Sequence, residues 1–331
     1  MKRKWLLSAA LFSALALAAC GGEEETKTAT NDAEEIRIGY FPNMTHIATI
    51  VGLEKGYFAE ELGDGVEITT STFSDGSSFM EAMSTDNIDY GTVGPTPALN
   101  TYLKNPQHEI IAGAVNGGAV LVTRADAGIE SLEDLKGKKI AVPTFGSTQD
   151  IGLRKTLEKA GLTADDVELI KQAPADTAAL FLQGEIDAAA TQEPWGVNIE
   201  TNAGAKLLEG ADEFAWGSES TNTVVVATKD FSDTNPELTE AALRAHTKAV
   251  EFITANPDEA IELFLGHIEE ITGKALSEEE VTKAFERLTP TTEVKEDILQ
   301  EMAEISVDAG YSTKDDITGL VNLEFLDAAQ K

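Results

Sequence analysis

Residues 36–40 read Ile-Arg-Ile-Gly-Tyr, and they open a regular alternation of predicted strands and helices. Their alternation of apolar and polar side chains predicts a strand, and residues 66–70 and 88–93 predict two more. Between these strands, residues 48–56 and 79–83 have the spacing of short helices, and the first of them ends in glycine. The order βαβαβ favours a largely parallel sheet that is covered by helices.

The same order of elements returns further along the chain. The pair Ile186-Asp187 matches the pair Ile88-Asp89, and a proline follows each of these two strands. The repeated strands and helices are expected at residues 140–161, 167–170, 177–182 and 186–190. We therefore expect two related α/β lobes. The alternative is that any tandem of such units looks self-similar, and it also leaves two α/β units.

The length of the chain and its remaining segments predict how the two lobes are connected. A body that runs from residue 35 to 331 exceeds a typical single hydrophobic core. We expect the chain to cross between the lobes near residues 120–122 and 223–226, and a helical tail to pack on the first lobe. The tail helices are expected at residues 238–254, 257–264, 276–280, 293–309 and 317–328. The predicted parts are a first lobe at residues 35–119, a second lobe at 120–223, and a return to the first lobe at 224–331.

The N-terminus has the pattern of a secretory signal. A basic start precedes an apolar run, so residues 1–19 are predicted to be a signal peptide. The small residues before Cys20 resemble the lipobox of bacterial lipoproteins, and Cys20 is the only cysteine, so we predict that it carries a lipid. The alternative is an ordinary secretory signal with an incidental cysteine. Residues 20–34 lack large apolar side chains and are predicted to be a flexible tether.

The chain is strongly acidic, with a formal net charge of −33. This charge disfavours nucleic acid as a partner, because nothing would neutralise the phosphates. It also disfavours charge-driven binding to anionic lipids. We therefore expect an extracytoplasmic protein that is held at the cell membrane, on the periplasmic side or the outer surface, through its lipid anchor only.

Loops at the ends of the predicted strands supply a candidate ligand site. In open α/β sheets, ligands bind beyond the carboxyl ends of the strands and near helix N-termini. Residues 146–149 combine a glycine, two hydroxyls and an amide at a helix start, which suits an anion or a polar ligand. The candidate ligand-binding residues are Asn43, Thr45, His46, Ser77, Thr96, Gly117, Gly118, Gly146, Ser147, Thr148, Gln149, Gln192, Glu193 and Trp195.

Several of these candidates have a purely structural alternative. Asn43, Thr45 or Ser147 could simply cap a helix. The pair Gly117-Gly118 fits either a hinge or a close approach of a ligand to the backbone, and Trp195 could pack in a core.

No arrangement of catalytic or metal-binding residues emerges from the sequence. The four histidines lack metal-ligand spacing, and the only cysteine is assigned to the lipid. Nucleophile-elbow, Walker and dinucleotide-binding motifs are absent. We therefore predict no enzyme activity, no catalytic residue, no metal and no cofactor.

Several segments together resemble one superfamily, the solute-binding proteins of ABC importers for aliphatic sulfonates, nitrate and taurine, which also includes thiamine-precursor binders. The segments are residues 39–46, 52–58, 131–143, 184–188 and 192–194. Two loops, residues 43–46 and 146–150, most resemble the sulfonate-binding branch.

The resemblance implies a periplasmic-binding-protein type II-like fold, in which two α/β lobes are joined by two crossover strands and close over a small polar solute. It also implies docking on the transmembrane subunits of an ABC permease, and we expect a monomer. The expected ligand is an aliphatic sulfonate. The alternatives are a thiamine-pyrimidine precursor, riboflavin, nitrate or bicarbonate, and, from another class, an enzyme of the same fold.

Overall fold

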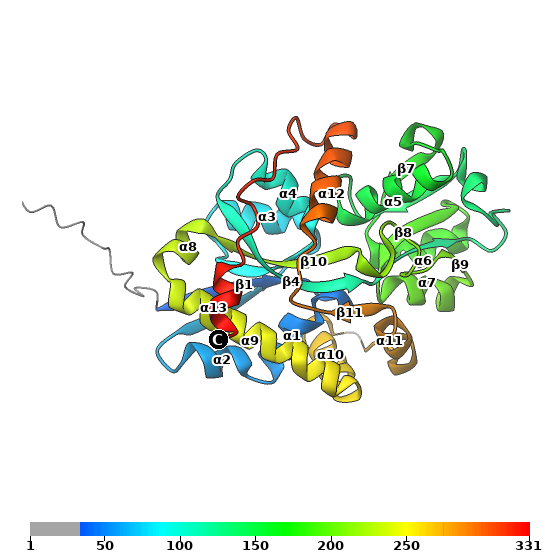
Figure 1. The fold of residues 1–331 in the computed structure, drawn as a ribbon. Helices are drawn as coiled ribbons and strands as arrows, with labels where there is room; N and C mark the ends of the chain where they lie inside the picture. The colour runs from blue at the N-terminus through cyan, green and yellow to red at the C-terminus, as the bar shows by residue number, and fades with distance from the viewer. Residues whose placement is uncertain (1–33, 274) are drawn as a thin grey trace, which may run out of the picture.

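The computed structural model describes residues 34–273 and 275–331. Within them the chain forms two α/β lobes that lie side by side, with the second lobe at the right of Figure 1. The predicted signal peptide, the lipidation at Cys20 and the tether as far as residue 33 lie outside the described residues. None of the described helices is both long and apolar enough to cross a membrane.

The first lobe is built on a six-stranded sheet with the order β11-β4-β10-β3-β1-β2. Its strands are β1 (Glu35–Tyr40), β2 (Glu67–Thr72), β3 (Tyr90–Val93), β4 (His108–Gly117), β10 (Thr221–Thr228) and β11 (Leu288–Pro290). β1 runs parallel to β2 and β3, whereas β10 runs antiparallel to β3 and β4. Its helices before the first crossing are α1 (Ile47–Glu54), α2 (Tyr57–Leu62), α3 (Gly76–Ser84) and α4 (Pro95–Tyr102). All residues of β4 and β10 are buried, because the sheet is covered on both faces.

The second lobe is built on a five-stranded sheet with the order β7-β6-β8-β5-β9. Its strands are β5 (Ala119–Thr123), β6 (Lys139–Val142), β7 (Glu168–Lys171), β8 (Ala188–Gln192) and β9 (Lys206–Glu209). Its helices are α5 (Thr148–Lys159), α6 (Pro174–Gln183) and α7 (Trp195–Ala203). The run β7-β6-β8-β5 repeats the run β2-β1-β3-β10 of the first lobe, with three parallel strands followed by an antiparallel one.

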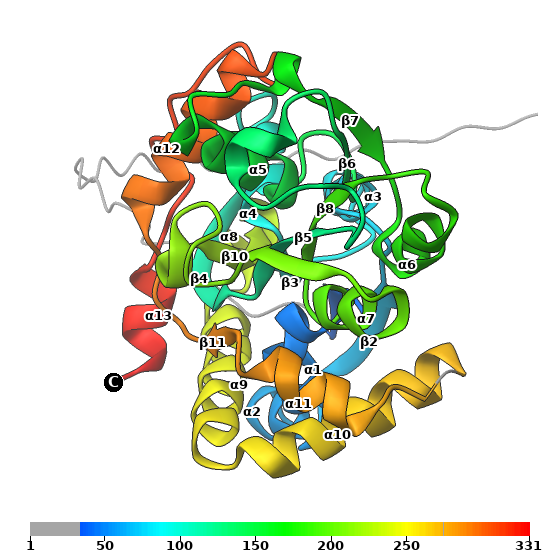
Figure 2. The ribbon, with the colours of Figure 1, turned by 90° about the vertical axis from the view of Figure 1, so that its right-hand side faces the viewer.

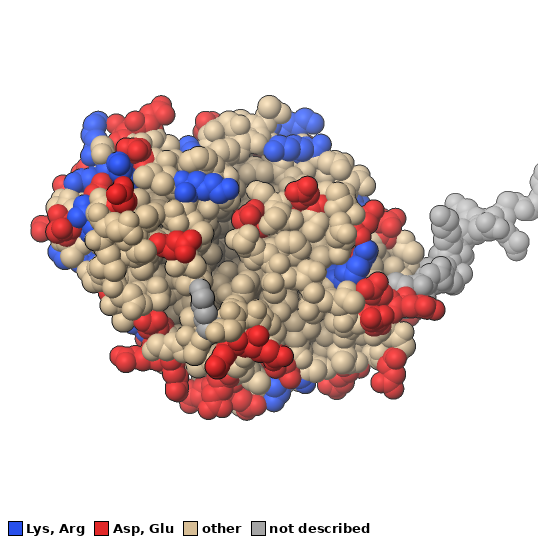
Figure 3. Space-filling model, turned by 180° about the vertical axis from the view of Figure 1, so that it is seen from behind, with Lys and Arg blue, Asp and Glu red and all other residues tan. Residues whose placement is uncertain are grey.

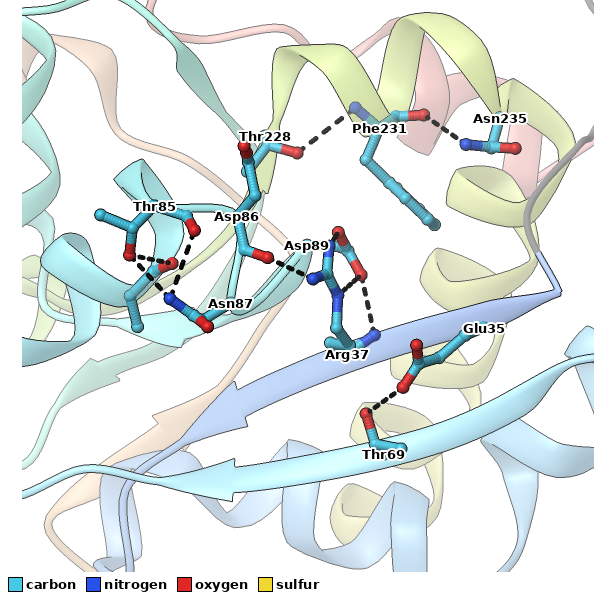
Figure 4. Close-up of polar contacts among 11 residues, drawn as sticks. Glu35, Arg37, Thr69, Thr85, Asp86, Asn87, Asp89, Thr228, Phe231 and Asn235 are labelled. Carbon is cyan, nitrogen blue, oxygen red and sulfur yellow. Dashed lines mark hydrogen bonds and ion pairs between the residues drawn. The ribbon is translucent and has the colours of Figure 1, made fainter.

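An aspartate before the third strand of each lobe explains the repeated Ile-Asp pair. Asp89 accepts a hydrogen bond from the backbone N–H of Arg37 (3.0 Å) and another from its Nε (2.8 Å; Figure 4). Asp187 accepts one from the backbone N–H of Lys139 (3.0 Å) and one from the Arg124 guanidinium (2.9 Å). Each aspartate therefore ties the third strand to the first, and Arg37 corresponds to Lys139 in the repeat.

The chain passes between the lobes twice. β4 ends at Gly117 in the first sheet, and β5 begins at Ala119 in the second. The return runs from the end of β9 at Glu209 to the start of β10 at Thr221. Gly117 and Gly118 have φ angles of +67° and +70°, a left-handed conformation that glycine adopts without strain.

The helical tail packs on the first lobe, as predicted. It comprises α8 (Lys229–Thr234), α9 (Pro236–Ala255), α10 (Pro257–Thr272), α11 (Glu278–Phe285), α12 (Glu296–Asp308) and α13 (Glu324–Ala329). α9 contacts α1 and α2, and α12 contacts α4. Two tail helices also reach the second lobe, where α12 lies beside α5 and α11 lies beside α7 (Figure 2).

The prediction of a helix over residues 317–328 is wrong in its first half. Ile110 of β4 donates a backbone hydrogen bond to Leu320 (2.7 Å) and accepts one from Asn322 (2.9 Å). These bonds pair the segment with β4 as extended chain. The helix α13 therefore begins only at Glu324.

Candidate functional site

A cavity lies between the two lobes, where β1, β6 and β8 end. Its volume is about 60 Å³, taken as the space open to a water-sized molecule. Its lining residues come from both lobes: Phe41, Asn43, Thr45, His46, Ser74, Asp75, Gly76, Gly94, Pro97, Pro143, Thr144, Ser147, Thr148, Gln149, Gln192, Asn222 and Thr223.

The first lobe contributes the loop that follows β1. Asn43 caps the short 3-10 helix η1 (Met44–His46), because its Oδ1 accepts hydrogen bonds from the N–H (3.0 Å) and the hydroxyl (2.8 Å) of Thr45. The Phe41 ring lies against the His46 imidazole, with 4.7 Å between the ring centroids. The side chains of the loop therefore hold its shape.

His46 is also held by the sheet beneath it. Its Nδ1 lies 2.8 Å from the Thr92 hydroxyl, which lies 3.0 Å from the Thr49 hydroxyl. Burial lowers the pKa of His46 to about 3, so the imidazole is neutral near pH 7. Because Thr92 occupies Nδ1, Nε2 is the ring nitrogen that remains for a molecule in the cavity.

The second lobe contributes the N-terminus of α5. Ser147 caps this helix, because its hydroxyl accepts a hydrogen bond from the Asp150 N–H (3.2 Å). The N–H groups of Thr148 and Gln149 lie in the first turn, where a helix has no acceptor for them. These N–H groups and the helix dipole suit this end of α5 to an anionic group.

Two residues of β10 that sequence reasoning missed, Asn222 and Thr223, also line the cavity. Asn222 is buried, accepts a hydrogen bond from Gln149 Nε2 (3.0 Å) and donates one to the Gly117 carbonyl (2.8 Å). Within the described part of the chain, the Thr223 hydroxyl and the Gln192 Oε1 are buried atoms without a hydrogen-bond partner. Buried polar atoms normally have partners, so these two are suited to meet a ligand or water.

The charge of the cavity comes from Asp75. Asp75 caps α3, because its Oδ1 accepts hydrogen bonds from the N–H groups of Ser77 and Ser78, both at 3.0 Å. Among the described residues that line the cavity, Asp75 is the only charged one, and none is lysine or arginine. Elsewhere, acidic side chains spread over both lobes and are densest along the lower edge of Figure 3. The cavity therefore offers neutral hydrogen-bond donors rather than cationic side chains.

The structure brings half of the candidate residues together at this cavity, and their role in binding stays a prediction. Those that line it are Asn43, Thr45, His46, Ser147, Thr148, Gln149 and Gln192. Ser77 and Gly146 line a neighbouring hollow, and Thr96 is buried at the start of α4. Gly117 and Gly118 lie at the first crossing between the lobes.

Glu193 and Trp195 lie at the start of α7, outside the cavity lining. Glu193 is fully buried, accepts a hydrogen bond from the Val197 N–H (3.0 Å), and lies 2.6 Å from the Arg287 guanidinium. Burial raises the pKa of Glu193, and Arg287 opposes this effect. Trp195 is half-buried as the first residue of α7. The Glu193 carboxylate is therefore paired within the protein and does not face the cavity.

The lobes touch beside the cavity at Gly94 and Thr148. A Cβ atom at Gly94 would lie only 2.5 Å from Thr148 Oγ1, so a larger residue there would force this hydroxyl to move. The N–H of Thr96 lies 3.5 Å from the same oxygen. The two lobes are thus closed on each other at this side of the cavity.

No three His, Cys, Asp or Glu side chains among residues 34–273 and 275–331 gather closely enough to hold a metal ion.

The sequence matches one protein family and several known proteins. A model described as the NMT1-like family matches residues 29–264. A Bacillus subtilis protein that is provisionally named an aliphatic sulfonates-binding protein is 28% identical over 306 residues, which cover 90% of this chain and 87% of the relative. The taurine-binding periplasmic protein of Escherichia coli is 29% identical over 203 residues, which cover 61% of each.

A solved structure shares the architecture. The alkanesulfonate-binding protein SsuA from Xanthomonas axonopodis pv. citri, bound to MOPS, matches with a TM-score of 0.74 and 19% identity. The match covers 86% of this chain and 96% of that one. At this identity the likeness concerns the fold, and it confirms the predicted periplasmic-binding-protein type II-like architecture.

Proposed function

Because this chain belongs to the NMT1-like family, we propose that it is the extracytoplasmic solute-binding component of an ABC importer and that it captures an aliphatic sulfonate. The names of the Bacillus subtilis relative and of the Xanthomonas structure support this choice of ligand. The lobes close over the ligand by a hinge motion at the two crossings, and the closed form docks on the permease.

The observation that carries this proposal is the convergence of neutral donors from both lobes on one cavity. The oxygens of a sulfonate group only accept hydrogen bonds. The second lobe offers the N–H groups of Thr148 and Gln149 and the hydroxyl of Ser147, and the first lobe offers His46 Nε2 when Nδ1 accepts from Thr92. A ligand that bonds to both lobes binds the closed form best and shifts the population toward it.

The attachment to the membrane is part of the same proposal. Residues 1–19 are removed as a signal peptide, Cys20 carries the lipid, and residues 20–34 form the tether. The body then acts as a monomer whose first lobe comprises residues 35–119 and 224–331 and whose second lobe comprises residues 120–223. Its cavity binds a solute and catalyses no reaction.

A thermal-unfolding screen of residues 35–331 tests the function. A ligand that binds only the folded protein raises its stability by about 2.7 kcal/mol when its concentration is 100 times Kd. We expect ethanesulfonate or taurine to raise the unfolding temperature. A rise with nitrate, bicarbonate, a formylaminopyrimidine or riboflavin alone would replace the ligand class, and no rise with any of them would refute a solute-binding role.

A further inference from the structure

The helical tail contacts the second lobe through α12 and the segment that follows it. Within α12, Glu301 accepts hydrogen bonds from the Trp216 indole, in the return crossing, and from Lys155 of α5. Beyond α12, Tyr311 reaches the N-terminus of α5. The segment that follows α12 therefore contacts the same helix end that lines the cavity.

Asp150 is the residue of α5 that Tyr311 reaches. Its side chain is fully buried, and Oδ2 accepts hydrogen bonds from the Tyr311 hydroxyl (2.6 Å) and from the Gly146 N–H (2.8 Å). Oδ1 accepts one from Arg154 Nε (3.0 Å), and the Asp150 N–H donates to the Ser147 hydroxyl. Asp150 is thus tied to both Gly146 and Ser147, which immediately precede the helix.

Tyr311 completes the surroundings of this carboxylate. Its hydroxyl accepts a hydrogen bond from Arg154 Nη2 (3.0 Å), and the Arg154 guanidinium lies 5.2 Å from the centre of its ring. A Cβ atom at Gly146 would lie 3.5 Å from the same ring, so the ring lies directly over that backbone. Burial raises the pKa of Tyr311 to about 12, so its hydroxyl keeps its proton at neutral pH.

We infer that Tyr311 is a positioning residue for the ligand loop, residues 143–149, and holds it through Asp150 without touching the ligand. A short, charge-assisted bond from the tail fixes the carboxylate, and the carboxylate fixes the Gly146 amide. A binding loop that is already ordered loses less entropy when its ligand arrives. The effect on affinity rests on the proposed function, whereas the effect on the loop itself does not.

Tyr311→Phe and a matched control test this inference. Tyr102 also anchors the tail, because its hydroxyl donates to the Thr318 carbonyl (2.8 Å), but this bond does not involve the second lobe. We expect Tyr311→Phe to speed hydrogen exchange of the Gly146 amide about tenfold in the ligand-free protein, as loss of a charged hydrogen bond predicts. Tyr102→Phe should leave that exchange unchanged, even where it lowers the unfolding temperature.

Ligand binding supplies the second readout. We expect Tyr311→Phe to weaken ethanesulfonate binding about fivefold, mostly through faster dissociation, and Tyr102→Phe to leave it unchanged. Equal exchange at Gly146 in Tyr311→Phe and in the unmodified protein would overturn the inference, whatever happens to affinity. Faster exchange in a protein that binds no sulfonate would support the positioning role and refute the proposed ligand.

Discussion

The loop after β1 and the loop after β6 occupy equivalent places in the two lobes, yet they are held in different ways. Each follows the first strand of its sheet's parallel run and leads into a helix at the cavity. The first loop is held by its own lobe, since Asn43 caps it and Thr92 of β3 bonds to His46.

The second loop is held within its own lobe by the Ser147 cap and by Asp150, and it is also held from outside that lobe. Tyr311 of the tail bonds to Asp150, and Asn222 of β10 bonds to Gln149. Thr148 lies against Gly94 of the first lobe.

The two walls of the cavity are therefore stabilised by different parts of the molecule. The first wall is complete within one lobe, so its shape does not depend on how the lobes are arranged. The second wall takes part of its shape from contacts with the first lobe and the tail, so opening the lobes would change that part. Changes at the first loop should therefore lower the stability of the free protein, and changes at the second should lower ligand affinity.

The largest effect is expected at the contact between Gly94 and Thr148. Alanine fits the Gly94 backbone, where φ is −60°, but its Cβ would meet Thr148 Oγ1 at 2.5 Å. We expect Gly94→Ala to weaken ethanesulfonate binding about 10- to 100-fold, or roughly 1.4–2.7 kcal/mol, with little change in the unfolding of the free protein. Calorimetric titration measures the affinity.

Thr148→Ala provides the control for this steric effect. It removes the oxygen that the new methyl group would meet, so adding it to Gly94→Ala should restore the affinity to that of Thr148→Ala alone. A double variant that binds much more weakly than Thr148→Ala would contradict the contact as the cause.

The next effect concerns the first loop. Thr92→Val keeps the shape of the side chain but leaves the buried His46 Nδ1 and the Thr49 hydroxyl without this partner. We expect the free energy of unfolding of the free protein to fall by about 2 kcal/mol, measured by urea denaturation. Thr70→Val, on the exposed surface of β2, is the control and should change little. Equal values for the two variants would show that the first loop is not held in this way.

The stability of the protein should fall in acid because the buried imidazole of the first loop is neutral. The pKa of His46 is about 3 in the folded protein against an ordinary value of 6.5, so protonation favours the unfolded chain. Above pH 6.5 this group should not lower the free energy of unfolding. By pH 5.5 it should lower that free energy by about 1.4 kcal/mol, and the free energy should keep falling down to pH 3. His46→Asn replaces the Nδ1 contact with an amide and should remove this part of the acid sensitivity. Parallel pH curves for the two proteins would show that His46 is not buried in its neutral form.

The smallest effect separates two acidic side chains near the starts of α3 and α6. Asp75 lines the cavity, whereas Asp176, in the first turn of α6, is exposed outside it. Asp75→Asn still caps α3, and we expect it to weaken taurine binding relative to ethanesulfonate binding about fivefold, because only taurine carries an ammonium group. Asp176→Asn should leave this ratio unchanged. An unchanged ratio in Asp75→Asn would mean that the carboxylate does not interact with the ammonium group of bound taurine.

Much of the fold could be predicted because its signals are local. Alternation of apolar and polar side chains marks β1 and β2, and the repeated Ile-Asp pair marks β3 and β8. The segment at residues 317–323 misled the prediction, because its helix-like spacing is overridden by hydrogen bonds to Ile110. The strand β11 is only three residues long and pairs with β4, far away in the sequence, so it has almost no signal of its own.

The site was predictable in part for the same reason. Loops that join a strand to a helix can be read from the sequence, and they supplied residues such as Asn43 and Gln149 that line the cavity. Asn222 and Thr223 were missed because they stand at the start of a buried strand, where polar residues give no sign of facing a cavity. Glu193 was selected from its loop, but its partner Arg287 lies far along the chain.

Local sequence patterns were sufficient to predict the two-lobed α/β architecture and the loops that bring polar residues to one cleft, because these features depend on short-range patterns that repeat. Which of those residues share a cavity, and what holds each of them, depends instead on tertiary packing. Tyr311 and Asp150 are far apart in sequence, as are Arg287 and Glu193, and Asn222 and Gln149. Such pairs form only when the two lobes and the tail are packed together, so no local pattern encodes them.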